Sequence, residues 1–240
     1  MRVEGGKAIY GARIGILMLE ARFPRIPGDM GNAQTWEFPV LYRVVPGASP
    51  HRVVRERAAG LLEPFVAAAR SLVADGAEAI TTNCGFLSLF QAELAAAQPV
   101  PVLTSALQQV RGVNALLPSG KVAGILTISN TSLSQDHLTA AGVPPGTPIG
   151  STEDGQEFTR AILGNESTLD IEAARQDNVA AARALQQAHP NLGAMVLECT
   201  NMPPYAEDIA AATGLPVFSM VTFVNWLHAG LAPRSYPANL

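Results

Sequence analysis

The sequence predicts an α/β protein with two similar lobes, in which mostly parallel sheets are flanked by helices and a pseudo-twofold internal duplication relates the lobes. Apolar runs of strand length alternate with amphipathic segments of helix length, a pattern typical of parallel sheets covered by helices. The only two cysteines, Cys84 and Cys199, each follow such a run and precede such a helix. A proline-valine pair follows each cysteine by 17 positions, at Pro101 and at Pro216. These repeats indicate two halves of one design.

The duplication also sets the predicted lobe boundaries. Gly15 and Gly124 each stand before Ile-Leu in an apolar strand and are 109 positions apart, and the two cysteines are 115 positions apart. We therefore expect residues 1–104 to form the first lobe and residues 105–220 the second, with the C-terminal segment 221–240 packing back on the first. If the strand ends of two such lobes face each other, one cysteine from each lobe meets the other across a cleft.

The first half opens with a short apolar strand over 13–19 and a long loop from Glu20 to about Thr35. Two prolines stiffen this loop and two glycines let its backbone amides approach a ligand, so it is either a functional loop or an ordinary surface connection. Apolar spacing and proline or glycine breaks predict the remaining elements. They are a strand over 38–45, a helix over 54–74, a strand over 77–81, a helix over 86–97 and a strand over 99–103.

The second half repeats the alternation. Ser105 is a natural cap for a helix that extends to about Leu116, and a polar loop over 129–132 follows the next strand. The stretch 142–155 is dense in proline, glycine and threonine, so we expect a loop there. The other predicted elements are strands over 123–126, 194–197 and 215–219, and helices over 133–141, 156–163, 169–188, 202–213 and 223–231.

Composition narrows the class of protein. With 240 residues, of which 48% are hydrophobic and 15% charged, the chain can bury a large core. The net charge of −4 and the absence of like-charge blocks give no electrostatic footprint for nucleic acid or for an anionic membrane surface. No apolar run approaches the roughly 20 residues needed to span a bilayer. We therefore expect a cytoplasmic protein with reduced thiols and a small-molecule partner, and the apolar composition is compatible with a homodimer.

The two cysteines are the candidate catalytic residues. A single buried cysteine is often an inert apolar residue, but equivalent placement at two strand ends favours a paired function over inert packing or a disulfide. The positive end of the following helix favours the thiolate and is expected to bring the pKa of the thiol toward neutrality. One cysteine would then be a thiolate while its partner stays protonated. Two such groups can remove a proton from one face of a carbon and return one to the other face.

The sequence around both cysteines resembles a known family. Asn83-Cys84-Gly85 and Glu198-Cys199-Thr200-Asn201 are similar to the two motifs of the aspartate/glutamate racemase superfamily, which includes amino-acid racemases, hydantoin racemases, arylmalonate decarboxylases and maleate isomerases. The resemblance covers most of the chain as architecture and implies a cofactor-independent enzyme of two α/β lobes. The chain departs from the racemase pattern in that Asn83 precedes the first cysteine and Asn201 stands where glutamate racemases carry a histidine.

From these features we predict a racemase or epimerase, an isomerase of amino-acid metabolism, that acts at the α-carbon of a small carboxylate by two-cysteine proton transfer. Aspartate, glutamate and hydantoin are the substrates that the resemblance implies. A maleate-isomerase-like or arylmalonate-decarboxylase-like enzyme would use the same cleft differently. A non-catalytic small-molecule binding protein on a duplicated scaffold is the alternative from another class.

Donors around the substrate carboxylate are expected from residues beside the thiols and from strand-end loops. The candidate substrate-binding residues are Asn83, Gly85, Thr200, Asn201, Asp29, Asn32, Ser129, Asn130 and Thr131. Strand alternation would point Glu198 away from the cleft, which favours a structural ion pair with an arginine over proton transfer. A second substrate carboxylate would need an arginine, and Arg22 or Arg25 supplies one if the first loop folds inward.

No cofactor or metal is expected. Lys7 and Lys121 are the only lysines and neither lies in a cofactor motif, which disfavours Schiff-base chemistry. The glycine-rich motifs of nucleotide binding and the serine-hydrolase motif do not occur. The four histidines are scattered without metal-ligand spacing, at His51, His137, His189 and His228.

Overall fold

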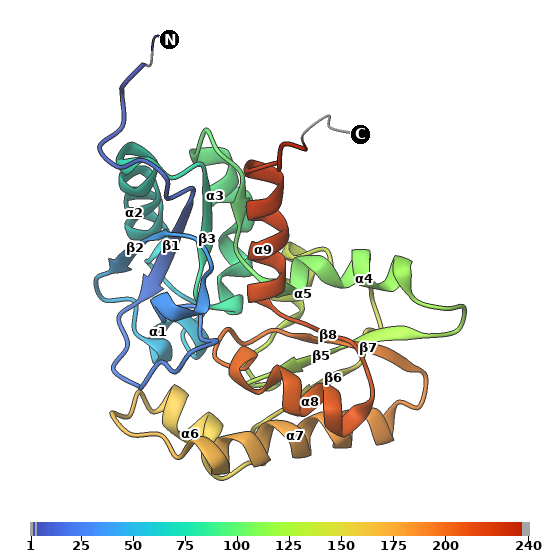
Figure 1. Ribbon diagram of the computed structural model, residues 1–240. Coiled ribbons are helices and arrows are strands. Elements are labelled where there is room, and N and C mark those ends of the chain that lie inside the picture. Colours follow the sequence, from blue (N-terminus) through green and yellow to red (C-terminus); the bar gives the residue numbers. More distant parts are fainter. Residues whose placement is uncertain (1, 3, 237–240) are drawn as a thin grey trace.

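Two four-stranded parallel sheets form the framework of the computed structural model, which describes residues 2 and 4–236 (Figure 1). The first sheet has the order β2-β1-β3-β4, with β1 at Ile14–Leu19, β2 at Val40–Val45, β3 at Ala79–Thr82 and β4 at Val102–Leu103. The second has the order β6-β5-β7-β8, with β5 at Val122–Thr127, β6 at Ile149–Ser151, β7 at Leu192–Leu197 and β8 at Val217–Phe218. If the strands of each sheet are counted from 1 in chain order, both sheets have the order 2-1-3-4. The predicted duplicated α/β fold is therefore confirmed.

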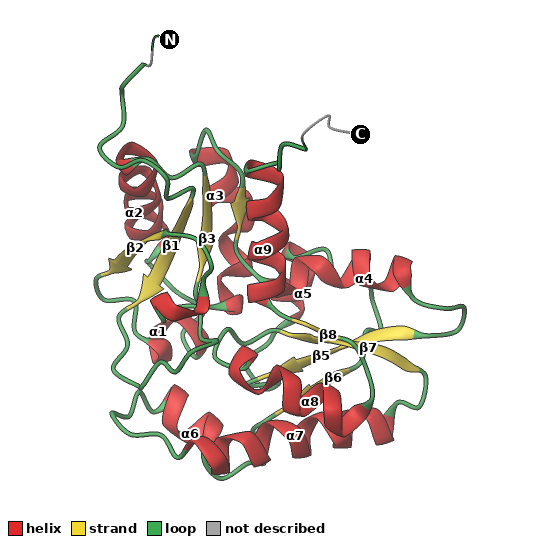
Figure 2. Ribbon diagram, viewed as in Figure 1, coloured by secondary structure: helices red, strands yellow, loops and turns green. Residues whose placement is uncertain are grey.

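Helices cover both sheets (Figure 2). In the first half they are η1 (Ala33–Thr35), α1 (Pro50–Val54), α2 (Leu62–Asp75), η2 (Gly85–Phe90) and α3 (Gln91–Ala97), where η denotes a 3₁₀-helix. In the second they are η3 (Ala106–Gln109), α4 (Val110–Leu116), α5 (Gln135–Ala140), α6 (Phe158–Leu163), α7 (Ile171–Ala188), η4 (Pro203–Tyr205), α8 (Ala206–Thr213) and α9 (Met220–Leu231).

The repeated glycines mark the same packing position in both sheets. A Cβ atom on Gly15 in β1 would lie 3.0 Å from the Cβ of Ala77 and 3.1 Å from that of Leu72 in α2. A Cβ atom on Gly124 in β5 would lie 2.8 Å from a methyl group of Leu192. Glycine at these positions lets neighbouring side chains pack directly on the central strand of each sheet. This explains why the glycine recurs in both halves.

Several predicted elements differ from the observed ones. The helix predicted over 54–74 is divided into α1 and α2 by a turn in which Arg57 (φ 56°) and Ala58 (φ 53°) adopt left-handed backbone conformations, which a continuous helix does not contain. The helix predicted over 86–97 begins as the 3₁₀-helix η2. Strand β6 lies inside the stretch predicted as a loop, because its three residues pair with β5 although the central one, Gly150, has a low strand propensity.

Helix α9 packs on the first lobe (Figure 1). The Nη1 atom of Arg13 donates a hydrogen bond of 2.7 Å to the carbonyl of Leu231, and the ring of His228 stacks on Phe38 at 3.6 Å. Residues 237–240 of the predicted C-terminal segment lie outside the described residues. Among the residues described, no helix is both long and apolar enough to cross a membrane. The lobe boundaries, the homodimer and the cytoplasmic location stay predictions.

Candidate active site

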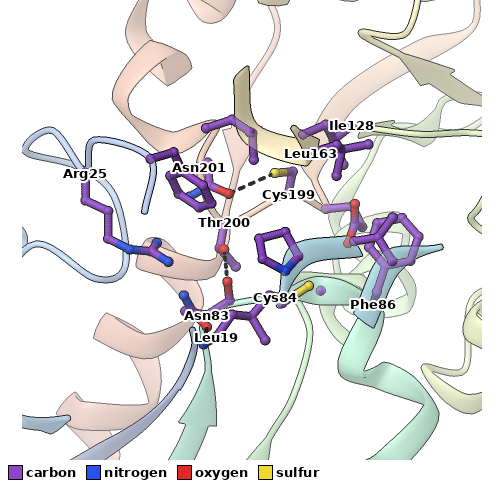
Figure 3. Close-up of a pocket in the computed structure, with 16 residues that line it drawn as sticks. Leu19, Arg25, Asn83, Cys84, Phe86, Ile128, Leu163, Cys199, Thr200 and Asn201 are labelled. Carbon is purple, nitrogen blue, oxygen red and sulfur yellow. Dashed lines mark hydrogen bonds between the residues drawn. The ribbon is translucent and has the colours of Figure 1, made fainter. Parts of the chain in front are cut away.

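Cys84 and Cys199 line one small cavity at the ends of β3 and β7 (Figure 3). Both are free thiols with 8% and 7% of their surface exposed. Parallel strands end at the same edge of a sheet, and the two sheets present these edges to each other. The cavity is lined by Leu19, Phe23, Arg25, Pro50, Val54, Asn83, Cys84, Gly85, Phe86, Ile128, Ile162, Leu163, Glu198, Cys199, Thr200 and Asn201. The structure thus brings together the six predicted residues that adjoin or include the cysteines, and their roles stay predictions.

Burial raises the pKa of both thiols. It raises the pKa of Cys84 to about 12, and the neighbouring carboxyl of Glu198 adds to the rise, while the backbone amides of Phe86 and Leu87 oppose it. Burial and Glu198 also raise the pKa of Cys199 well above its usual value. The expected lowering of a thiol pKa toward neutrality is therefore wrong, because loss of water outweighs the few amides at the start of each helical turn.

Glu198 lies in the cavity wall and not in an ion pair. Its side chain is fully buried, and Oε2 accepts a hydrogen bond of 2.7 Å from the hydroxyl of Thr127. Among the described residues, Oε1 is buried without a hydrogen-bond partner and no arginine pairs with the carboxyl. The predicted ion pair is wrong because β7 ends at Leu197, so strand alternation does not extend to Glu198. Burial raises the pKa of Glu198 to about 7.

The loop between β1 and β2 folds inward, so that its residue Arg25 lines the cavity. Its Nη1 atom donates a 2.8 Å hydrogen bond to Asp29 Oδ1, and the guanidinium carbon lies 4.6 Å from the centre of the Phe23 ring. Its Nη2 atom is buried without a partner in the described part of the chain. Arg22 is exposed and is absent from the lining. Arg25 is therefore the arginine that can meet a ligand carboxylate.

A second unpartnered donor belongs to Asn83. Its Oδ1 atom accepts a 2.8 Å hydrogen bond from the amide of Leu19, which fixes the orientation of the side chain. Its Nδ2 atom is buried and has no partner within residues 4–236. In Figure 3 the side chains of Arg25 and Asn83 lie on the same side of the cavity. A buried donor without a partner costs about 1–3 kcal/mol, so both donors are suited to a ligand anion.

Asp29 and Asn32 form hydrogen bonds with residues that line the cavity. Asp29 pairs with Arg25, and its Oδ2 atom accepts a hydrogen bond from Asn201 Nδ2. The thiol of Cys199 donates to Asn201 Oδ1 over 3.6 Å. Asn32 donates a 2.8 Å hydrogen bond to the carbonyl of Arg25 and caps η1. Neither residue lines the cavity, so both position residues that do.

The structure does not bring Ser129, Asn130 and Thr131 to the cysteines. The hydroxyls of Ser129 and Thr131 donate to Glu153 and also accept hydrogen bonds of 3.2 Å from Arg55. Asn130 is exposed. These bonds connect the segment after α1 with the second lobe. The loop instead contributes Ile128 to the cavity.

Sequence reasoning missed the apolar wall of the cavity. Pro50 and Val54 come from α1, and Ile162 and Leu163 come from α6. Apolar residues in a helix predict a core and carry no ligand signal, so only the three-dimensional structure identifies them. In residues 2 and 4–236, no group of three or more histidine, cysteine, aspartate or glutamate side chains is placed to hold a metal ion.

Comparison with curated proteins identifies relatives that share one named activity. The chain is 30% identical over 228 residues to a dimethylsulfoniopropionate lyase of Durusdinium sp. clade D, covering 91% of this chain and 75% of that relative. It is 28% identical over 240 residues to dimethylsulfoniopropionate lyase 5 of Emiliania huxleyi (strain CCMP1516), covering 90% of this chain and 45% of that longer protein. No family model matches the chain.

Solved structures share the fold at low sequence identity. Arylmalonate decarboxylase superposes with a TM-score of 0.61 at 17% identity, covering 95% of each chain. Allantoin racemase from Pseudomonas fluorescens superposes with a TM-score of 0.55 at 16% identity, covering 95% of this chain and all of the other. Their similarity to this chain confirms the two-lobed α/β fold that the resemblance of the cysteine motifs implied. The predicted racemase or epimerase function and the isomerase class are wrong, because the curated relatives are lyases.

Proposed function

Because this chain belongs to the dimethylsulfoniopropionate lyase family, we propose that it cleaves dimethylsulfoniopropionate to dimethyl sulfide and acrylate. The observation that carries the proposal is the cavity itself. Two buried thiols share it with two unpartnered donors, Arg25 Nη2 and Asn83 Nδ2. An elimination next to a carboxylate needs a base and an anion-binding site, and these four groups supply both.

Arg25 and Asn83 are proposed to bind the substrate carboxylate. The guanidinium already donates to Asp29 through Nη1, which leaves Nη2 free for the ligand. Asn83 is held by the amide of Leu19, so its free NH₂ group needs no reorientation. When the base removes a proton from the carbon next to the carboxylate, negative charge develops on the carboxylate oxygens. Donors already in place stabilise that charge more than they stabilise the free substrate.

A cysteine thiolate is the proposed base. It takes one hydrogen from the carbon next to the carboxylate, and the C–H electron pair forms the carbon–carbon double bond. The bond from the neighbouring carbon to sulfur breaks with both electrons on sulfur, which leaves as neutral dimethyl sulfide. The proton on the cysteine then returns to water. The sulfonium charge of the bound substrate lowers the raised thiol pKa, and a thiolate of high pKa is a strong base.

Product analysis tests the proposal. Purified protein is incubated with dimethylsulfoniopropionate, dimethyl sulfide is measured in the headspace by gas chromatography, and acrylate is measured in solution by proton NMR. We expect the two products in equal amounts. Absence of both, from a protein with a native circular dichroism spectrum, would contradict the proposal.

Two cysteine variants assign the base. Cys84→Ser and Cys199→Ser each remove one thiol from the same cavity, so each variant is the matched control for the other. Loss of a general base typically lowers the rate by 10²–10⁴-fold. We expect a loss of this size in at least one single variant and in the double variant. Full activity in the double variant would exclude thiol catalysis.

A further inference from the structure

The unpartnered polar groups in the cavity include groups of opposite charge. Arg25 and Asn83 offer donors, whereas Glu198 offers the acceptor Oε1, which is buried without a partner in the described residues. A buried carboxylate oxygen without a donor is costly and is rarely left so by chance. Its burial and its place in the wall mark it as a site for a ligand group.

Arg25 and Glu198 both line the cavity, and within the described residues they do not pair with each other. In Figure 3 Arg25 and Phe86 are on opposite sides of Cys84 and Cys199. The carboxyl of Glu198 packs against Gly85, the residue next to Phe86, because a Cβ atom on Gly85 would meet Glu198 Oε1. The cavity therefore contains a cationic group, Arg25, and an acidic group, Glu198, together with both thiols.

The surroundings of Glu198 suit a cation that cannot donate hydrogen bonds. Phe86, Ile128, Ile162 and Leu163 line the cavity with apolar surface. A primary ammonium needs several acceptors, but a sulfonium or quaternary ammonium carries only methyl and methylene groups around its charge. Such a cation is stabilised by a desolvated carboxylate and by apolar and aromatic surface, and Glu198 and Phe86 both line the cavity.

We infer that Glu198 binds the positively charged sulfur of the substrate, so that the cavity selects zwitterions with a carboxylate at one end and a methylated onium group at the other. The inference rests on the proposed function for the identity of the onium group. The positive charge on sulfur disappears as the carbon–sulfur bond breaks. Glu198 therefore stabilises the bound substrate more than the transition state, so its removal raises KM and does not lower kcat.

Two inert ligands of the same shape isolate the charge. 3-(Trimethylammonio)propanoate carries a quaternary nitrogen where 4,4-dimethylpentanoate carries a quaternary carbon, and the two have the same carboxylate and the same chain length. Calorimetric titration of the wild type is expected to show tighter binding of the ammonium compound by about tenfold or more. Equal affinity, or no binding of the ammonium compound, would overturn the inference without any variant.

The variant Glu198→Gln tests the residue. It keeps a hydrogen-bond acceptor for Thr127 and removes the charge, and the affinity ratio between the two ligands is expected to fall close to one. Glu153→Gln is the matched control, because Glu153 is a carboxylate of the same lobe that bonds Ser129 and Thr131 and does not line the cavity. Its ratio should equal that of the wild type. An unchanged ratio in Glu198→Gln would overturn the inference.

The proposed lyase activity and the proposed onium site can be contradicted independently of each other. If the wild type distinguishes the two ligands and Glu198→Gln does not, the onium site stands even if no dimethyl sulfide is released. If dimethyl sulfide is released but the wild type binds both ligands equally, the lyase proposal stands and the onium site falls.

Discussion

The hydroxyl of Thr200 donates a hydrogen bond to the main-chain carbonyl of Asn83. The two residues are 117 positions apart, and each is the immediate neighbour of one of the two cysteines. Both are buried. This bond joins the lobes at the point where the thiols meet, so it sets the position of one thiol relative to the other.

Replacement of Thr200 by valine should loosen this junction. Thr200→Val keeps the shape but leaves the buried carbonyl of Asn83 without its donor, which costs about 1–3 kcal/mol of unfolding free energy. Urea unfolding measures the loss, and the rate of dimethyl sulfide release should fall with it. Thr200→Ser restores the hydroxyl and should recover most of the activity. Equal activity of the valine and serine variants would show that the bond does not position the thiols.

Replacement of Arg25 should weaken substrate binding. A hydrogen bond to a charged group contributes about 1.5–3 kcal/mol, so Arg25→Gln is expected to raise KM for dimethylsulfoniopropionate by roughly 10–150-fold. Steady-state kinetics measures the change. Arg22→Gln removes the same charge from the same loop at an exposed position and should leave KM near the wild-type value. A similar rise in both variants would indicate a general charge effect in place of a direct contact.

Gly85 should tolerate no side chain. In Gly85→Ala the new Cβ atom would meet Oε1 of Glu198 and lie 2.5 Å from the main-chain oxygen of that residue. The backbone of the neighbouring lobe cannot move without shifting Cys199, so both melting temperature and activity should fall. Gly112 in α4 has open space where a Cβ would be. Gly112→Ala should be neutral or stabilise the helix by about 0.5–1 kcal/mol, and a comparable loss in both variants would contradict the packing argument.

Stability should depend on pH through Glu198. Burial raises its pKa from 4.5 to about 7, so between these values the folded protein holds a proton that the unfolded chain releases. The stabilisation from this proton is present at pH 4.5 and is lost as pH rises through 7, a change of about 3 kcal/mol. Because Glu198→Gln cannot titrate, the wild-type stability should fall by this amount relative to the variant between pH 4.5 and pH 8. Parallel curves in urea unfolding would show that Glu198 keeps its ordinary pKa.

The duplicated fold and the meeting of the two cysteines could be predicted because both depend on local pattern. Cys84 and Cys199 each follow a buried strand, and parallel strands of similar lobes place such residues at facing edges. The thiol pKa could not be predicted in this way. It depends on how much water the assembled lobes exclude and on Glu198, neither of which is a property of a short sequence window.

The polar residues predicted to bind substrate show the same limit. Ser129 and Thr131 resemble ligand-binding residues in sequence, but their hydroxyls are taken by Glu153, which is more than twenty positions away. Glu198 was expected to face away because strand alternation was extended one residue beyond the end of β7. Arg25 reaches the cavity through the path of a long loop, which local pattern does not determine. These contacts are all set by the tertiary structure.

The proposed binding of the carboxylate by Arg25 and of the onium group by Glu198 also has a stereochemical consequence. Two such contacts hold a zwitterionic substrate in one orientation only. The two hydrogens on its prochiral methylene then point toward different walls of the cavity. A base on one wall can reach only one of them, and a substrate that carries a single deuterium of known configuration should either keep the label in acrylate or lose it completely.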